Sequence, residues 1–260
     1  MMYAEIVKEL EDILRFRAKP IGVKFCESVD MLDQVPNLVK PSHPLAMCQV
    51  FGLSRFAGKT IGVTAEDILG GAQEIIMGNC ATIFGLAEPV DFIRSGEMLG
   101  HGCFAGVEEA RKEQDAIKRI PAGKYKAIIV SPASDGNLEE PDVVAFYASP
   151  GQIMQLMNGL VYKDYEPVSM RFVGESSCSD GIVTCFLTGK PAGTIPCFGE
   201  LQRAGREDEV ILAIPPRKLA SVLEGVKSWQ NLGNSYPVTP FGAQCSPLSM
   251  PAVNVYPMAE

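Results

Sequence analysis

Two stretches of the sequence, DVVAFYASPGQIMQLMNG at residues 142–159 and EVILAIPPRKLASVLEG at residues 209–225, share one pattern. In each stretch, an apolar run about as long as a β-strand is followed by a proline. A segment with helical spacing of apolar residues comes next, and it ends at a glycine. In the first stretch Ser149 and Pro150 are typical of the N-cap and first residue of a helix. The pattern therefore predicts a strand followed by a helix in both stretches.

Shorter matches in the same order extend this similarity along the chain. Residues 20–25 match residues 167–172, and residues 101–105 match residues 195–199. Between these segments, Cys48 matches Cys178 and Gly58-Lys59 matches Gly189-Lys190. Matches that recur in order predict an internal duplication. Its first half would span about residues 20–160, with a helical insertion at about 64–120, and its second half about 167–227.

The remaining patterns support an α+β or α/β fold. Residues 3–16 have the spacing of an amphipathic helix, while residues 21–25 and 125–130 are typical of strands. We expect two related halves whose strands are covered by helices, with a cleft between the halves. This body would occupy residues 1–228. Residues 229–260 hold five prolines and several aromatic side chains but almost no charge, so we expect them to pack on the body.

Composition narrows the classes of partner. The chain of 260 residues carries a net charge of −8, and its basic residues form no blocks, which disfavours nucleic-acid binding. It holds no run of 18 apolar residues, which disfavours a membrane span. The N-terminal stretch lacks the features of a secretory signal, so we expect a cytoplasmic protein. A homo-oligomer is an alternative that the sequence leaves open.

Cysteines carry the sharpest chemical signal. The chain has eight of them but no Cys-x-x-Cys, which disfavours a zinc ribbon or a thioredoxin-type motif. The duplication would pair Cys48 with Cys178 and Cys103 with Cys197, and Cys80 would be an additional ligand. Thiolates bind zinc, Cu(I) and Fe–S clusters, so these five residues are candidate metal ligands. Two alternatives stay open, namely buried structural cysteines and a single reactive thiol.

Three further residues are candidates for cofactor binding. His101 precedes Gly102 and Cys103 in a glycine-rich stretch, where a backbone can approach a ligand closely. Arg203 and Arg206 follow Cys197 and could hold a carboxylate or phosphate group. The alternative for all three is a solvated loop.

Several of these stretches together resemble a known family. They are residues 20–25, Cys48-Gln49 with Gly58-Lys59, Cys80 with residues 84–87, residues 141–144 with Pro150, Cys178, and residues 197–199 followed by Asp208-Glu209. The set resembles the domain-of-unknown-function family numbered 169 (DUF169) of bacteria and archaea, over the chain up to about residue 228. The resemblance implies a cytoplasmic protein and assigns no catalytic residue.

Two hypotheses for function follow. The first is a cysteine-centred site that binds a metal such as zinc, an Fe–S cluster or a small cofactor, with a redox role. The second is a non-enzymatic small-molecule binding or accessory protein in which the cysteines are structural. The sequence does not decide whether the protein is an enzyme.

Overall fold

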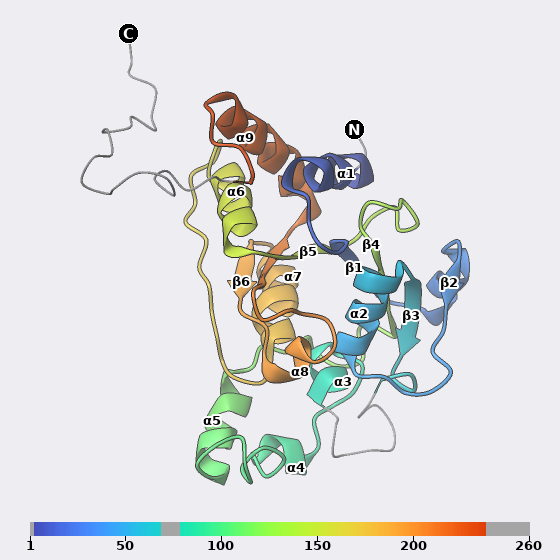
Figure 1. Cartoon of the computed structure of the whole chain (residues 1–260). Helices are drawn as coiled ribbons and strands as arrows, with labels where there is room; N and C mark the ends of the chain where they lie inside the picture. Colours follow the sequence, from blue (N-terminus) through green and yellow to red (C-terminus); the bar gives the residue numbers. More distant parts are fainter. Residues whose placement is uncertain (1–2, 69–78, 238–260) are drawn as a thin grey trace, which may run out of the picture.

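The strands form a single mixed sheet in the computed structural model, which describes residues 3–68 and 79–237 (Figure 1). Within these residues the sheet has seven strands in the order β2-β3-β4-β1-β5-β7-β6. All neighbouring strands are antiparallel except β2 and β3, which are parallel. Their bounds are β1 (Ile21–Cys26), β2 (Leu38–Val39), β3 (Thr60–Thr64), β4 (Ala127–Pro132), β5 (Val143–Ala148), β6 (Ala192–Thr194) and β7 (Val210–Ile214).

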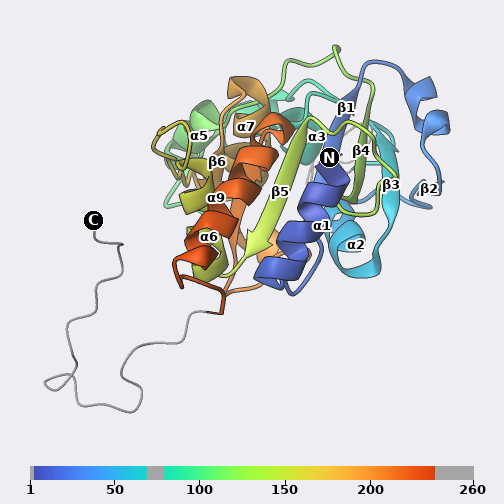
Figure 2. The same ribbon diagram turned by 90° about the horizontal axis from the view of Figure 1, so that it is seen from above.

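Three long helices cover one face of the sheet. These are α1 (Tyr3–Leu14), α6 (Pro150–Leu160) and α9 (Leu219–Asn231), the last preceded by the short helix η4 (Pro216–Lys218). Figure 2 shows them lying together over β5. Their apolar faces pack on Val144, Phe146 and Leu212, which alternate along β5 and β7 with side chains that point to the opposite face.

The opposite face carries α2 (Met47–Ala57) and a continuous helical segment formed by η3 (Ser179–Val183) and α7 (Thr184–Thr188). Their side chains pack on Val23, Val130 and Ala145. Because both faces of the sheet are covered, every residue of β4 and β5 is buried. The mixed sheet covered by helices confirms the predicted α+β class.

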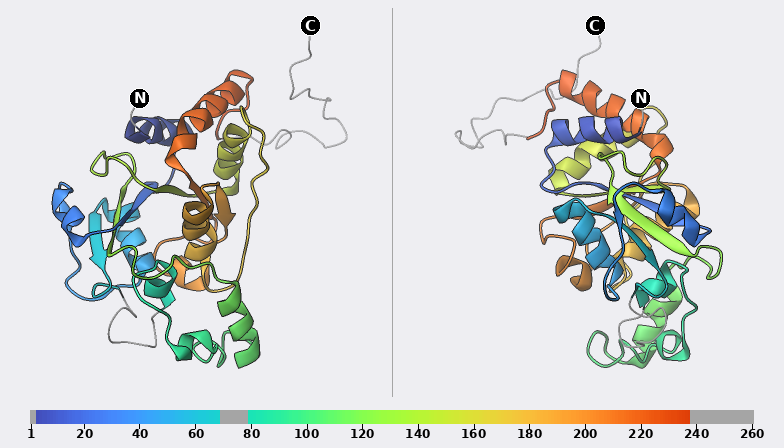
Figure 3. Two further views of the ribbon diagram at one scale, coloured as in Figure 1. Left: turned by 180° about the vertical axis from the view of Figure 1, so that it is seen from behind. Right: turned by 90° about the vertical axis from the view of Figure 1, so that its right-hand side faces the viewer.

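Smaller elements surround this frame. The turn η1 (Val29–Gln34) follows β1, and α8 (Phe198–Leu201) follows β6. Between β3 and β4 the chain forms α3 (Asn79–Ile83), α4 (Asp91–Arg94) and α5 (Val107–Ala116). In both views of Figure 3, α4 and α5 lie at the end of the molecule away from α1 and α9. None of the helices within the described residues is long and apolar enough to cross a membrane.

The strand–helix units expected at residues 142–159 and 209–225 are both present, as β5–α6 and β7–α9. Two other matched segments also have similar local structure. Helices α2 and α7 end at Gly58 and Gly189, with φ of 66° and 64°, and a strand of the sheet follows each. Met170 forms a parallel bridge with Gly193 of β6, as β2 does with β3. The duplication and the cleft between its halves stay predictions, which superposition of the two segments would test.

The C-terminal segment is described only in part. Tyr236 packs against the apolar core that α1, α6 and α9 form on the sheet, and the packing of the whole C-terminal segment stays a prediction. Residues 238–260, which include Cys245, lie outside the described residues, and so does most of the predicted packed segment.

Candidate functional site

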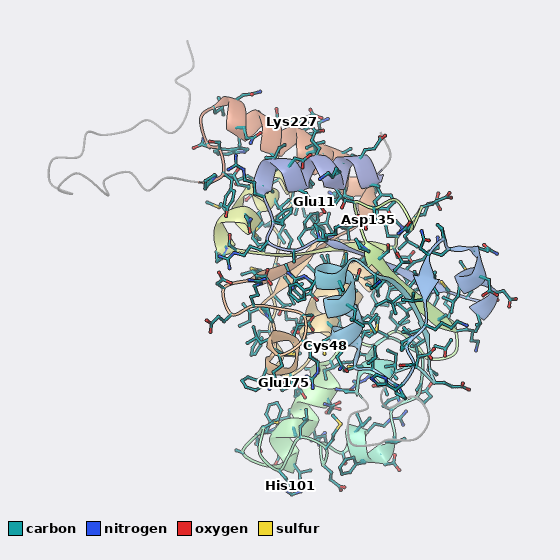
Figure 4. All side chains as sticks on the ribbon, turned by 45° about the vertical axis from the view of Figure 1, so that its right-hand side comes forward. Glu11, Cys48, His101, Asp135, Glu175 and Lys227 are labelled. Carbon is teal, nitrogen blue, oxygen red and sulfur yellow. The ribbon has the colours of Figure 1, made fainter. Side chains whose placement is uncertain are left out.

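A cavity of about 250 Å³ lies on the α2 face of the sheet, and all five candidate cysteines line it. They come from five separate places in the chain: Cys48, Cys80, Cys103, Cys178 and Cys197. The rest of the lining is both apolar and polar, and consists of Ala46, Asn79, Ile83, Met98, Leu99, Glu175, Gly199, Glu200 and Arg203. In Figure 4 the labelled Cys48 and Glu175 lie close to each other beside this face. The structure thus brings these cysteines to one cavity without any short motif.

Helix ends place two of the thiols. Cys48 is the second residue of α2, whose first turn is fixed because the Gln49 side chain accepts a hydrogen bond from the backbone N–H of Ala46 at 2.8 Å. Cys178 is the residue immediately before η3. Both side chains belong to the apolar core on this face and are nearly buried, with 8% and 9% of their surface exposed.

The other three cysteines come from the shorter elements. Cys80 lies in α3 and Cys197 immediately precedes α8. Both are partly buried, whereas Cys103 is exposed. Cys48, Cys80, Cys178 and Cys197 are thus the four cavity cysteines that are buried or partly buried. We call them the inner cysteines.

Burial keeps the inner cysteines protonated. It raises the pKa of Cys48 and Cys178 well above the ordinary thiol value, and that of Cys80 to about 11. The pKa of Cys197 is also raised by burial, although a hydrogen bond with the Ser177 side chain opposes the shift. A thiolate is the reactive form of cysteine, so none of these four groups is a preformed nucleophile at neutral pH.

The thiols line the cavity without converging on one point. Among the described residues, no three histidine, cysteine, aspartate or glutamate side chains are placed to hold a single metal ion. The cavity is also much larger than the roughly 30 Å³ that one water molecule occupies in the liquid. A zinc-type site built on these cysteines is therefore not present in the described structure.

A buried polar chain leads from the cavity wall into the core. Glu200, which is 2% exposed, accepts a hydrogen bond from Tyr147 Oη at 2.5 Å and another from Ser177 Oγ at 3.4 Å. The Arg55 guanidinium lies 4.1 Å from the Tyr147 ring centroid. Its Nη2 donates to both carboxylate oxygens of Glu209, at 2.9 and 3.0 Å.

This polar chain affects the charge beside the thiols. Burial raises the pKa of Glu200, while its hydrogen bond from Tyr147 and the nearby Arg55 lower it. Sequence reasoning did not identify Tyr147, Arg55 or Glu209. One signal was available, since Arg55 is the only charge in the apolar stretch 45–57.

The three cofactor candidates are placed differently. Arg203 lines the cavity, and its Nη1 donates to the Gly199 carbonyl at 3.0 Å. Its own carbonyl lies so close to Gly52 of α2 that a Cβ there would be 2.2 Å away, which explains the glycine. Arg206 is not among the lining residues, because its guanidinium lies over the Phe56 ring at 5.7 Å.

His101 is also outside the cavity. It is exposed in the turns between α4 and α5, and Figure 4 shows it at the edge of the molecule, away from Cys48 and opposite the edge at which Lys227 lies. Its neighbour Cys103 does line the cavity. His101 and Cys103, which Gly102 separates, thus differ in their position relative to the cavity, and a cofactor in the cavity as described would not contact His101 or Arg206.

Comparison with protein families agrees with the sequence resemblance. A family model described as "Uncharacterised ArCR" matches residues 9–225, which include all five cavity cysteines. The chain belongs to the DUF169 family. No curated protein and no solved structure matches the chain. The cavity itself is therefore the main indication of what this DUF169 protein does.

Proposed function

We propose that this DUF169 protein binds an Fe–S cluster in the cysteine cavity, through the inner cysteines Cys48, Cys80, Cys178 and Cys197, and uses it in a redox role. The observation that carries the proposal is the meeting of four cysteines from α2, α3, η3 and α8 at one cavity. Four cysteine thiolates are the usual ligand set of an Fe–S cluster. A cluster contains several iron atoms, so its ligands surround a volume instead of meeting at one point.

The other cysteines provide an internal comparison. Cys26 and Cys185 are fully buried among apolar side chains and line none of this cavity. Burial raises the pKa of Cys26 to about 11 and that of Cys185 to about 12. These two residues are structural in our account, since a buried cysteine behaves as a small apolar side chain.

Local sequence context does not distinguish the two groups, because Cys178 immediately precedes the helical segment that contains Cys185. Their positions relative to the cavity do. The proposal therefore assigns ligand function only to cysteines that line it.

Anaerobic reconstitution with ferric iron, sulfide and a thiol reductant tests this assignment. We expect the wild-type protein to become brown and to retain iron after desalting. A Cys48→Ala/Cys178→Ala variant should retain little, since only two inner cysteines are left. The matched control, Cys26→Ala/Cys185→Ala, removes the same number of buried thiols and should retain iron as the wild type does. Equal iron in the two double variants, or none in the wild type, contradicts the proposal.

A second candidate function is binding of a small organic molecule, with structural cysteines. The apolar wall formed by Ile83, Met98 and Leu99, together with Arg203, favours this alternative. Native mass spectrometry of the purified protein separates the two. A bound organic mass without iron supports the second function, and iron with sulfide supports the first.

We also propose a cytoplasmic location. The seven cysteines within the described residues form no disulfide, and free thiols persist in reducing compartments. Expression of the chain with an export signal, followed by thiol counting, would test whether it tolerates an oxidising compartment.

A further inference from the structure

A second cavity, of about 290 Å³, lies beside α7 and has a different lining. It is bounded by residues 166–169 and Arg171, by Thr184 and Thr188 of α7, and by Lys218 before α9. Four basic side chains and two acidic ones line it: Lys118, Arg171, Lys190, Lys218, Glu166 and Asp180. We call it the lysine cavity.

The two acids in the lysine cavity are already paired. Lys190 Nζ forms an ion pair with Glu166. Arg171 Nη1 lies 3.3 Å from Asp180, which also accepts a hydrogen bond from the backbone N–H of Val173 at 2.8 Å. Both carboxylates therefore have cationic partners within the wall.

Two lysines of the lining have no acidic partner within the described residues. Within the described residues, neither Lys118 nor Lys218 forms an ion pair. Lys218 still acts electrostatically on Glu166, and Lys118 acts on Asp180, which places each lysine near one of the pairs. Both side chains are partly buried. The lining thus carries an excess of two positive charges on a chain whose net charge is −8.

We propose that the lysine cavity binds a small organic anion whose phosphate or carboxylate group is neutralised by Lys118 and Lys218. Lysine binds such groups as a compact point charge with three hydrogen-bond donors. Leu160, Val168 and Ala192 provide an apolar wall for the rest of the molecule. The volume is at the lower end of the range for ligand pockets, roughly 300–1,000 Å³, which restricts the ligand to small molecules. The inference is independent of the cysteine cavity.

Calorimetric titration of the full-length protein tests the site, with inorganic phosphate and acetate as separate probes at constant ionic strength. We expect saturable binding of at least one probe, and the tighter probe identifies the group that the site prefers. A Lys118→Gln/Lys218→Gln variant should weaken that binding at least tenfold. The matched control is Lys8→Gln/Lys227→Gln, which removes equal charge from lysines that do not line the cavity and that pair with Asp12 and Glu9 of α1.

Binding in the control should stay within twofold of the wild type. Equal weakening in both variants would show a general charge effect and overturn the site. Saturation by neither probe in the wild type would also overturn it. Thermal unfolding of each variant without ligand shows whether the fold is intact before the titration is interpreted.

Discussion

Near the start of one helical segment, residues 179–188, the chain passes from the cysteine cavity to the lysine cavity, and the charged groups of the two cavities are neutralised in different ways. Cys178 precedes this segment and faces the first cavity, while Asp180 and Thr184 line the second. Beside the cysteines, Glu200 and the Arg55–Glu209 pair are buried and bonded to protein groups. Beside the lysines, the Glu166–Lys190 pair is exposed.

The difference indicates what each cavity can accept. The cysteine cavity presents neutral thiols, so a ligand there must bind sulfur directly or pack against apolar groups. The lysine cavity has an electrostatic field from unpaired cations, so it attracts anions before contact. Four predictions test this contrast, from the largest expected effect to the smallest.

Removing one partner of an ion pair should cost far more beside the cysteine cavity. Arg55 and Glu209 have 0% and 3% of their side chains exposed, so Glu209→Gln leaves a buried guanidinium without its counter-charge. We expect a loss of about 3–5 kcal/mol in the free energy of unfolding, measured with urea. The matched Glu166→Gln change in the exposed pair should have a much smaller effect on the free energy of unfolding. Similar losses in both variants would contradict the contrast.

Thiol reactivity should differ sharply across the cysteine cavity. Cys103 is exposed, whereas Cys178 is buried and its pKa is raised well above the ordinary value by burial. Alkylation by iodoacetamide at pH 8, followed by peptide mapping, should label Cys103 at least tenfold faster than Cys178 because the thiolate is the reacting form. Comparable rates would mean that the inner cysteines are open to solvent and ionised.

Salt should weaken binding at the lysine cavity alone. Attraction between a dissolved anion and partly exposed lysines is screened as the Debye length falls from about 10 Å at 0.1 M to about 3 Å at 1 M salt. We expect phosphate or acetate affinity to fall several-fold over this range. Iron retained in the cysteine cavity should not change, since metal–thiolate bonds are local. An anion affinity that is independent of salt would argue against a charge-driven site.

The two acids of the lysine cavity should give pH dependences of opposite sign. Burial raises the pKa of Asp180 in the folded protein above its value of about 3.9 in the unfolded chain. Asp180 therefore stabilises the fold at pH values below about 3.9, and this contribution is lost as pH rises through the pKa of Asp180 in the folded protein. The hydrogen bond from Lys190 lowers the pKa of Glu166 in the folded protein below its value of about 4.3 in the unfolded chain. Glu166 therefore stabilises the fold at pH values above about 4.3, and this contribution is lost as pH falls through the pKa of Glu166 in the folded protein.

Urea unfolding at several acidic pH values, with Asp180→Asn and Glu166→Gln as references, measures each contribution by difference. The free energy of unfolding of the wild type minus that of Asp180→Asn should fall as pH rises. The corresponding difference for Glu166→Gln should increase as pH rises. The second effect should be small because Glu166 is exposed. Slopes of the same sign would contradict the assigned environments.

Local patterns made part of this structure predictable from the sequence. The apolar run in residues 143–148 and the helical spacing after Pro150 depend on neighbours within a few residues, and both elements formed where expected. The class of fold followed from such units. The sequence match of Cys48 and Gly58-Lys59 with Cys178 and Gly189-Lys190 directed attention to cysteines that do line one cavity.

Features that depend on long-range contacts were not predictable in the same way. Arg55 meets Glu209 across the core, 154 positions along the chain, and no local pattern indicates such a partner. The lysine cavity joins Lys118 and Lys218 from distant segments for the same reason. His101 and Arg206 were assigned to a ligand because they stand near cysteines in sequence, but side-chain direction in a loop depends on its packing.

Metal and sulfide analysis of the anaerobically purified protein, combined with its visible spectrum, tests the central claim most directly. Our account predicts brown protein with iron and acid-labile sulfide in proportion to the chain, and loss of both in Cys48→Ala/Cys178→Ala but not in Cys26→Ala/Cys185→Ala. Colourless protein that contains neither iron nor sulfide, and that takes up neither on reconstitution, would contradict it.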